Sequence, residues 1–339
     1  MSSGGGCPGS RSLIRRILLA GLAILPAAHA QAQWAGVVER GQTTESPALG
    51  RPLVYNVYRP AAVPAAGRRW PTLYLLEGRP AEADWLDQGF VYEVIDQAVA
   101  EGLIPPTLVV IPVTPFSWYV DNPDPGGQGM MRTAILQDLA PAIDARYPTA
   151  ACREGRAIAG VSMGGYGALL YGLERPDAFV AAASFSGAIA PPIDARDVQR
   201  LKRADAFYDG AFGRPLDRGR FNAWNLFTRV RQWPAGEEPA PAILLAAGDR
   251  DRSGLIQSTA RFHAELLRAG LDSSLRIGPG AHDWPTWRAH LADALRWLGP
   301  KLRTSCSELA DGQGPEPRTR GDTADAVTFS RVTFAAAQT

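Results

Sequence analysis

The sequence predicts an α/β fold, with a mostly parallel central sheet covered by helices on both faces. Seven short apolar, strand-like runs alternate with helical segments along the chain, which is the pattern of strands that are buried on both faces. These runs and helices occupy about 260 residues, enough for one substantial core and within the range of a single α/β domain. A third observation, a serine held between glycines where a strand meets a helix, points to the chemistry.

The expected elements follow one another in chain order. Apolar runs predict strands at residues 53–58, 73–76, 108–111, 157–159, 180–185, 243–247 and 275–277. Helices are expected at residues 88–101, 133–146, 164–173, 254–269 and 285–298. No internal repeat is visible, so residues 31–300 are expected to form one catalytic domain, interrupted by an insertion at residues 191–239.

The most informative run is GVSMGG at residues 160–165, which places Ser162 between a strand and a helix. Small neighbours allow a tight turn that strains the serine backbone and exposes its hydroxyl. The pattern G-x-S-x-G is weak by itself and gains meaning from its context. When the serine is a nucleophile, an acid and then a histidine are expected further along the chain.

His282 is the expected catalytic base. The chain has four histidines, of which His29 falls in a segment expected to be removed. His263 and His290 fall in predicted helices, where a histidine is usually solvated or packed. His282 instead lies in the loop GPGAHDW at residues 278–284, directly after a predicted strand. Loop residues that a rigid scaffold positions in this way often carry function.

The acid is expected after the strand that precedes this histidine. The run AILLAAG at residues 242–248 is followed by Asp249, Arg250 and Asp251. Asp251 is the preferred acid because the turn at Gly248 leaves room for two residues before a carboxylate returns toward the histidine loop. Asp249 is the alternative, and the aspartate that is not used is expected to form a surface ion pair with a neighbouring arginine.

An acyl-transfer mechanism also needs two donors for the oxyanion of the tetrahedral intermediate. One is expected to be the backbone N–H of Met163, at the positive end of a helix dipole. The second is expected from the loop after the strand at 73–76, which reads EGRP. Gly78 lets the backbone turn closely and Pro80 has no N–H, so the N–H of Arg79 is the candidate.

These motifs resemble the Putative esterase family of α/β hydrolases, which includes feruloyl esterases, S-formylglutathione hydrolase, enterochelin-esterase-like proteins and mycolyltransferases. The resemblance covers roughly residues 50–300 and rests on LLEG (75–78), LAPAIDARY (139–147), RAIAGVSMGGYGA (156–168), SGA (186–188) and GAHDW (280–284). It implies the α/β-hydrolase fold, a triad of Ser162, Asp251 and His282, and oxyanion donors at Met163 and Arg79. The run MMRTA at residues 130–134 departs from the family, where an acidic and aromatic run usually precedes this helix.

Substrate contacts are expected from aromatic side chains near the predicted site. Trp118 and Tyr119, in the loop at residues 116–122, and Trp284, beside the predicted base, are candidates. The insertion at residues 191–239 is also aromatic, containing Tyr208, Phe212, Phe221, Trp224, Phe227 and Trp233. It is either a cap over the active site or a surface excursion anchored by these rings.

The two ends of the chain differ from this domain. Arg11, Arg15 and Arg16 precede an apolar run at residues 17–27 and small residues at 28–30, which is the pattern of a signal peptide over residues 1–30. The protein is therefore expected to be secreted or periplasmic, by the general route, with no stable membrane span after cleavage. Residues 301–339 shift toward Gly, Asp, Thr and Pro and are expected to be mostly disordered.

The composition restricts the classes of partner and cofactor that the protein is expected to bind. The formal net charge of +1 gives no basic footprint for nucleic acid. The few histidines and distant cysteines make no convincing metal site, and no cofactor is expected. Once Cys7 leaves with the signal, Cys152 and Cys306 remain, and they could either pair in an oxidising compartment or stay as free thiols.

Three function hypotheses follow. The first is an exported serine carboxylesterase acting on a small-molecule or carbohydrate-linked ester through an acyl-enzyme. The second is an acyltransferase, in which a sugar or another alcohol intercepts the same acyl-enzyme. The third is a binding protein on an inactive hydrolase fold, whose expected sign is a missing triad member, and none is missing.

Overall fold

The computed structural model describes residues 35–79, 87, 89–114, 116–234 and 239–306. All of these residues belong to one compact unit, residues 34–339. The expected signal peptide, residues 1–30, lies outside the described residues. Of the tail expected to be mostly disordered, residues 301–339, the first six are described and are held by backbone hydrogen bonds and a disulfide at Cys306, and residues 307–339 lie outside the described residues. Within the described ranges, no helix has both the length and the apolar character needed to cross a membrane.

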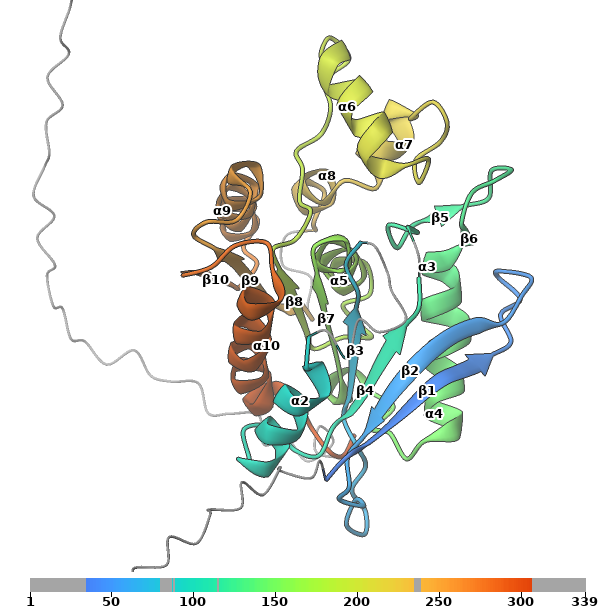
Figure 1. The fold of residues 1–339 in the computed structure, drawn as a ribbon, viewed down its shortest axis with the longest axis vertical. Coiled ribbons are helices and arrows are strands. Elements are labelled where there is room, and N and C mark those ends of the chain that lie inside the picture. Colours follow the sequence, from blue (N-terminus) through green and yellow to red (C-terminus); the bar gives the residue numbers. More distant parts are fainter. Residues whose placement is uncertain (1–34, 80–86, 88, 115, 235–238, 307–339) are drawn as a thin grey trace, which may run out of the picture. The chain divides into compact units, whose positions relative to one another are not determined.

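An eight-stranded sheet forms the centre of the fold (Figure 1). Its spatial order is β1-β2-β4-β3-β7-β8-β9-β10. The β1–β2 and β2–β4 pairs are antiparallel and the other neighbours are parallel. The strands are β1 (Val37–Thr44), β2 (Leu53–Arg59), β3 (Thr72–Leu76), β4 (Leu108–Pro112), β7 (Arg156–Val161), β8 (Ala181–Phe185), β9 (Ala242–Gly248) and β10 (Ser273–Gly278). A separate short hairpin pairs β5 (Asp121–Asn122) with β6 (Gly129–Met130).

Helices cover both faces of this sheet, because successive strand residues point to opposite sides. Leu73 and Leu75 pack in a core with α2 (Val91–Ala100) and α10 (Trp284–Leu298). Tyr74 and Leu76 pack in a second core with helices of the other face. Those helices are α3 (Met131–Thr133), the π-helical η1 (Ala134–Leu139), α4 (Ala140–Arg146), α5 (Met163–Glu174) and α9 (Ser253–Arg268). The predicted fold class is therefore confirmed.

Several details differ from the sequence expectation. The edge strand β1 was not predicted, because its run VVERGQTT mixes charged and apolar residues and is only half-buried. The helix expected at residues 133–146 begins at Met131 and contains the π-helical stretch η1. The insertion contains helices of its own, namely α6 (Val198–Tyr208), α7 (Arg218–Ala223) and α8 (Leu226–Arg231). The described residues also include two single turns of 3-10 helix, η2 (Arg153–Gly155) and η3 (Gly299–Lys301).

The order of the strands reverses beside β3. From β3 the chain moves to β4 on one side, and the next parallel strand, β7, lies on the other side. In open α/β sheets, ligands bind outside the carboxyl ends of the strands at such a switch point. The loops after β3, β7, β9 and β10 carry the residues singled out from the sequence.

Candidate active site

Ser162 lies in a strained turn between β7 and α5. Its backbone has φ 53° and ψ −109°, a region that residues other than glycine rarely occupy. The turn is fixed by its neighbours, because the Ser162 N–H donates to the carbonyl of Phe185 at 2.9 Å and its carbonyl accepts from the N–H of Ala188 at 2.9 Å. Both partners belong to β8 or the loop after it, so the adjacent strand holds the serine in place.

Two glycines make the turn sterically feasible. A Cβ atom at Gly164 would lie 2.1 Å from the carbonyl oxygen of Leu76, and one at Gly160 would lie 2.2 Å from the carbonyl oxygen of Gly164. Either contact is with backbone and cannot be relieved by a side-chain rotation. The sequence folds into this turn because it has no side chain at either position.

The structure brings Ser162, His282 and Asp251 together from three separate loops. His282 Nε2 lies 3.1 Å from Ser162 Oγ, and His282 Nδ1 lies 2.9 Å from Asp251 Oδ1. The Asp251 side chain is fully buried, whereas that of His282 is 16% exposed. This chain of hydrogen bonds can move a proton away from the serine hydroxyl and place the resulting imidazolium beside a carboxylate.

Asp249, the alternative acid, holds the histidine loop from the outside. Its Oδ1 accepts from the N–H of Gly280 at 3.0 Å, and its own N–H donates to the carbonyl of Gly278 at 2.7 Å. Its side chain is 53% exposed and lies 3.9 Å from the Arg250 guanidinium. The carboxylate that hydrogen-bonds His282 is therefore that of Asp251. The carboxylate of Asp249 instead hydrogen-bonds the backbone of the loop that carries His282.

Burial keeps the His282 imidazole ready to accept a proton. Burial lowers the pKa of His282 below the ordinary 6.5, the Asp251 carboxylate raises it, and the nearby Arg252 lowers it further. The net direction is downward. The indole of Trp287 stands edge-on to the imidazole, with ring centroids 4.9 Å apart. Trp287 was not singled out from the sequence, although its position three residues after Trp284 on a predicted helix was a usable signal.

The loop after β3 lies directly beside the serine. A Cβ atom at Gly78 would lie 3.5 Å from Ser162 Cβ and 3.3 Å from the carbonyl oxygen of Val161. The peptide that joins Gly78 to Arg79 is therefore adjacent to the nucleophile. Met163 is the first residue of α5 and is buried. Its backbone N–H is among those that lack a partner within the helix, and both predicted oxyanion donors flank Ser162.

Glu77 holds the loop after β3 in place through hydrogen bonds of its side chain and its backbone. It was not singled out from the sequence as a candidate site residue. Its side chain accepts from the N–H of Thr114 at 2.8 Å, and its carbonyl accepts from the hydroxyl of Tyr119 at 2.9 Å. The residue is 1% exposed, and burial raises the pKa of its carboxyl to about 7. An acidic residue directly after the apolar run at residues 73–76 was the signal that could have identified it.

The aromatic residues expected to contact substrate lie in different surroundings. Trp118 and Tyr119 are buried, and the Trp118 ring packs on Tyr208 and Phe207 of the insertion, with centroids 4.5 and 5.1 Å away. Trp284 is half-buried and packs against Trp287 at 5.3 Å. The structure therefore places Trp118 beneath the insertion, Tyr119 beneath the loop after β3, and Trp284 at the start of α10.

The insertion is tied to the loops at the carboxyl edge of the sheet. Figure 1 shows α6 and α7 beyond this edge. Side-chain hydrogen bonds connect it to the loops after β3 and β4 and to α5: Arg79 to the Phe207 carbonyl (2.7 Å), Asn122 to the Gly210 carbonyl (2.7 Å), Arg220 to Asp124 (2.5 Å), and Tyr166 to the Trp224 carbonyl (2.8 Å).

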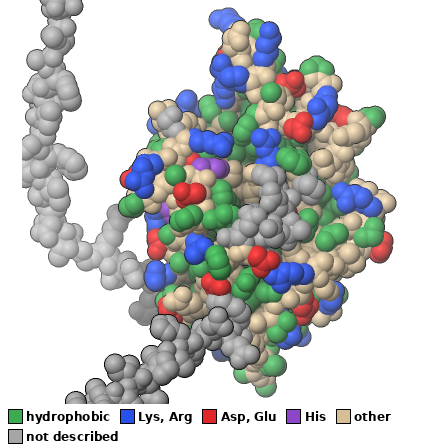
Figure 2. Space-filling model, in the orientation of Figure 1, with side chains coloured by type: hydrophobic (Ala, Val, Ile, Leu, Met, Phe, Trp, Pro, Cys, Tyr) green, Lys and Arg blue, Asp and Glu red, His purple; other side chains and the backbone are tan. Residues whose placement is uncertain are grey.

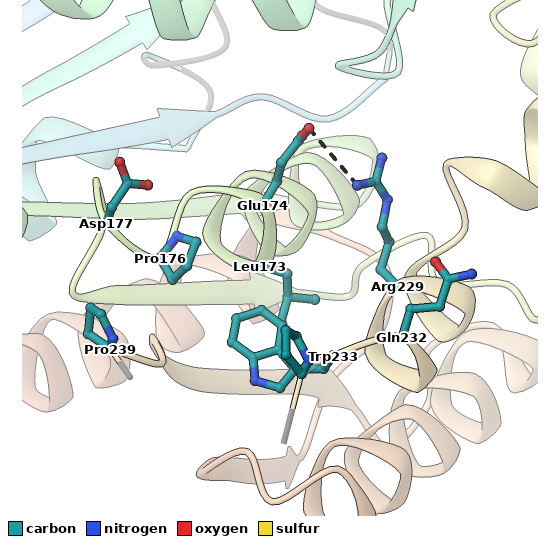
Figure 3. Close-up of a pocket in the computed structure, with 9 residues that line it drawn as sticks. Leu173, Glu174, Pro176, Asp177, Arg229, Gln232, Trp233 and Pro239 are labelled. Atoms are coloured by element: carbon teal, nitrogen blue, oxygen red, sulfur yellow. Dashed lines mark ion pairs between the residues drawn. The ribbon is translucent and has the colours of Figure 1, made fainter. Parts of the chain in front are cut away.

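A cavity of about 380 Å³ lies at the opposite end of α5 (Figure 3). Leu173 and Glu174 line it from the last turn of that helix, and Arg229 and Trp233 line it from the insertion. Figure 3 shows Glu174 and Arg229 pointing toward each other, as an ion pair at 4.0 Å. Because Ser162 caps the other end of α5, this cavity is separate from Ser162, His282 and Asp251.

Cys152 and Cys306 are joined in a disulfide, which settles the alternative that the sequence left open. Their Cα atoms are 5.9 Å apart, and 154 residues separate them in the chain. The bridge lies before the amino end of β7, at the sheet edge opposite Ser162. Two backbone hydrogen bonds reinforce it, from Arg69 to Thr304 at 2.7 Å and from Arg303 to Glu154 at 2.9 Å.

The molecular surface carries no single dominant charge on the face drawn in Figure 2. Basic and acidic side chains are interspersed there with hydrophobic ones (Figure 2). Among the described residues, no group of three or more His, Cys, Asp or Glu side chains is arranged to hold a metal ion.

The model of the family described as Putative esterase matches residues 46–298. An esterase of Mycobacterium tuberculosis is 28% identical over 276 residues, covering 76% of this chain and 58% of that protein. The chain thus spans little more than half the length of that relative.

Two further proteins match this chain over a larger share of their own length. An acetyl esterase of Caldicellulosiruptor saccharolyticus is 27% identical over 234 residues, covering 67% of this chain and 82% of that protein. A solved structure described as a ferulic acid esterase superposes with a TM-score of 0.62 at 25% identity, covering 79% of this chain and 99% of the other. The chain is therefore similar, in sequence and in fold, to proteins named as esterases.

Proposed function

From the premise that the chain belongs to the Putative esterase family, we propose that it is a serine carboxylesterase in which Ser162, His282 and Asp251 form the catalytic triad. The observation that carries the proposal is the hydrogen-bond chain of 3.1 and 2.9 Å that links the three side chains. A strained serine at the amino end of α5 supports it, because this geometry exposes a nucleophile beside a positive helix end.

The mechanism follows from this geometry. His282 Nε2 takes the proton of Ser162 as Oγ attacks the ester carbonyl, and the Asp251 carboxylate stabilises the imidazolium. The N–H groups of Met163 and Arg79 bind the oxyanion of the tetrahedral intermediate. His282 then gives its proton to the leaving alcohol, which departs as the acyl-enzyme forms. Water, deprotonated by His282, attacks the acyl carbonyl, and Ser162 leaves with the proton to release the acid.

The insertion at residues 191–239 is proposed as a cap over the site. It contacts the loop that carries Arg79 and the loop after β4, and it brings the rings of Phe207 and Tyr208 against Trp118. A segment held on these loops can restrict which esters reach Ser162. Substrate selection is therefore assigned mainly to the insertion.

Export is the second part of the proposal. The arginines and apolar run at the start of the chain are typical of a signal peptide. A disulfide between Cys152 and Cys306 supports an oxidising compartment, because such bonds persist mainly in secreted and periplasmic proteins.

The test is pre-steady-state release of p-nitrophenol from p-nitrophenyl acetate. The mature protein is expected to give a burst equal to the enzyme concentration, and Ser162→Ala and His282→Ala are expected to abolish it. His263→Ala is the matched control, since His263 lies on α9 and bonds Ser273 at 2.7 Å, and it should keep the full burst. A well-folded protein that gives no burst and no labelling of Ser162 by a fluorophosphonate would contradict the proposal.

A further inference from the structure

The side chain of Arg79 connects the loop after β3 to the insertion. Its Nη1 donates to the carbonyl of Phe207 at 2.7 Å. Its guanidinium carbon lies 5.1 Å from the ring centroid of Phe207 and 5.9 Å from that of Phe116. Arg79 thus contacts a helix of the insertion and the loop after β4 at once, through a hydrogen bond and two cation–π contacts.

The contact with Phe207 has a clear physical basis. Phe207 lies in the last turn of α6, where the carbonyls have no partner within the helix. A positive charge at this end also interacts favourably with the helix dipole. No basic residue occupies the last turn of α6 itself. Two arginines from outside the helix supply cations there, Arg214 at the Asp209 carbonyl and Arg79 at the Phe207 carbonyl, and of these Arg79 comes from a loop of the site.

The backbone of the same residue lies beside the nucleophile. Arg79 follows Gly78, whose backbone approaches Ser162 so closely that a Cβ atom there would lie 3.5 Å from Ser162 Cβ. The N–H of Arg79 is the second oxyanion donor in the proposed mechanism. One residue therefore holds α6 with its side chain and faces the reacting carbonyl with its backbone.

We propose that Arg79 is a positioning residue, whose side-chain bond to the end of α6 keeps its own peptide N–H aligned toward the oxyanion. This inference rests on the proposed function and extends it, because it couples docking of the insertion to assembly of the oxyanion hole. Phe116 and Phe207 keep 36% and 37% of their surface exposed, so the guanidinium lies between two rings that still reach solvent.

Kinetics of side-chain variants test the coupling, because every substitution retains the backbone N–H. Arg79→Ala is expected to lower kcat for p-nitrophenyl acetate by about tenfold, part of the 100-fold or more that loss of a whole oxyanion donor causes. KM should change less than about twofold, since the lost interaction is made in the transition state. Arg79→Lys should restore only part of kcat, because an ammonium lacks the planar fork that donates and stacks together.

Arg218→Ala is the matched control. Arg218 is an exposed arginine at the start of α7 in the same insertion, and its side chain makes no hydrogen bond or ion pair with the end of α6 or with the loops of the site in the described part of the chain. Its kinetics should equal those of the wild type. A kcat for Arg79→Ala equal to that of Arg218→Ala would overturn the proposal.

Two further measurements separate coupling from general damage. In a double-mutant cycle, Arg79→Ala and Phe207→Ala should lower kcat by less together than the product of their separate effects, because each removes the cation–π contact between the two side chains. Amide hydrogen exchange in α6 should accelerate in Arg79→Ala and not in Arg218→Ala. Fully multiplicative effects, or unchanged exchange in α6, would contradict the coupling. The exchange measurement needs no activity, so it tests the contact even if the wild type proves not to be an esterase.

Discussion

At the scale of single residues, backbone strain concentrates around Ser162. Seven described residues other than glycine have positive φ angles. Five of them lie in the loops after β4, β7 and β8, at Phe116, Trp118, Tyr119, Ser162 and Ser186, and the other two, Phe90 and Asp209, lie at the ends of α2 and α6. Each costs on the order of 1–3 kcal/mol and persists only where surrounding contacts fix it. At Ser162 those contacts are the hydrogen bonds to Phe185 and Ala188. The strain exposes the hydroxyl to His282 without any motion of the chain.

The direction of the His282 pKa shift predicts the pH dependence of catalysis. Only the neutral imidazole can accept the serine proton, and burial lowers its pKa below 6.5. The value of kcat/KM should therefore rise with pH through an acid limb centred below 6.5 and be level at neutral pH. Asp251→Asn removes a charge that raises this pKa, so the limb should move to still lower pH, while kcat falls by roughly 10⁴-fold. A limb centred above 6.5 in the wild type would contradict this assignment.

At the scale of elements, the turn between β7 and α5 depends on close packing against β3. Gly164 faces the carbonyl of Leu76, and Gly78 faces Ser162. These approaches bring the loop after β3 against the turn that carries Ser162. The glycines are therefore needed for the contact between elements as well as for the conformation of the turn.

Two glycine substitutions test this packing. Gly164→Ala should lower the free energy of unfolding by more than about 2 kcal/mol, because its Cβ would lie 2.1 Å from the backbone of β3. Gly254→Ala is the matched change in α9, where a Cβ meets no atom within 4 Å, and it should raise stability by up to about 1 kcal/mol. Urea denaturation of both variants gives the comparison. An unfolding midpoint for Gly164→Ala equal to that of the wild type would show that the turn relaxes freely.

Local sequence patterns predicted most elements and the residues now found together. Continuous apolar runs identified the strands that are buried on both faces, and glycine spacing identified the turn at Ser162. The half-exposed β1 lacks such a run and was missed. The role of Asp249 in holding the Gly280 loop depends on a contact across 31 residues. The Arg79 contact with Phe207 spans 128 residues, and no local pattern encodes either distance.

At the scale of the whole molecule, the tail after α10 returns to the start of β7. The disulfide between Cys152 and Cys306 closes a loop of 154 residues, and backbone hydrogen bonds of Thr304 and Arg303 accompany it. A cross-link across so long a loop restricts the unfolded chain strongly. It lies at the amino edge of the sheet, away from Ser162.

Removing the disulfide should therefore lower stability and leave catalysis unchanged. The double variant Cys152→Ser with Cys306→Ser is expected to lose about 3–5 kcal/mol of unfolding free energy. Its kcat at 25 °C should match that of the wild type, since no residue of the bridge contacts the site. Denaturation of the wild type with and without reductant provides the control. Equal stability of the reduced and oxidised protein would show that the bridge contributes nothing.

The same disulfide also determines how the chain responds to proteases. Ser162, Asp251 and His282 all lie between the two bonded cysteines, as does the whole insertion. A single cut anywhere from residue 153 to residue 305 therefore leaves two fragments that the disulfide still joins covalently. After such a cut, Ser162, Asp251 and His282 still belong to one covalently linked molecule. Cleavage of the backbone by a protease therefore does not by itself separate these three residues.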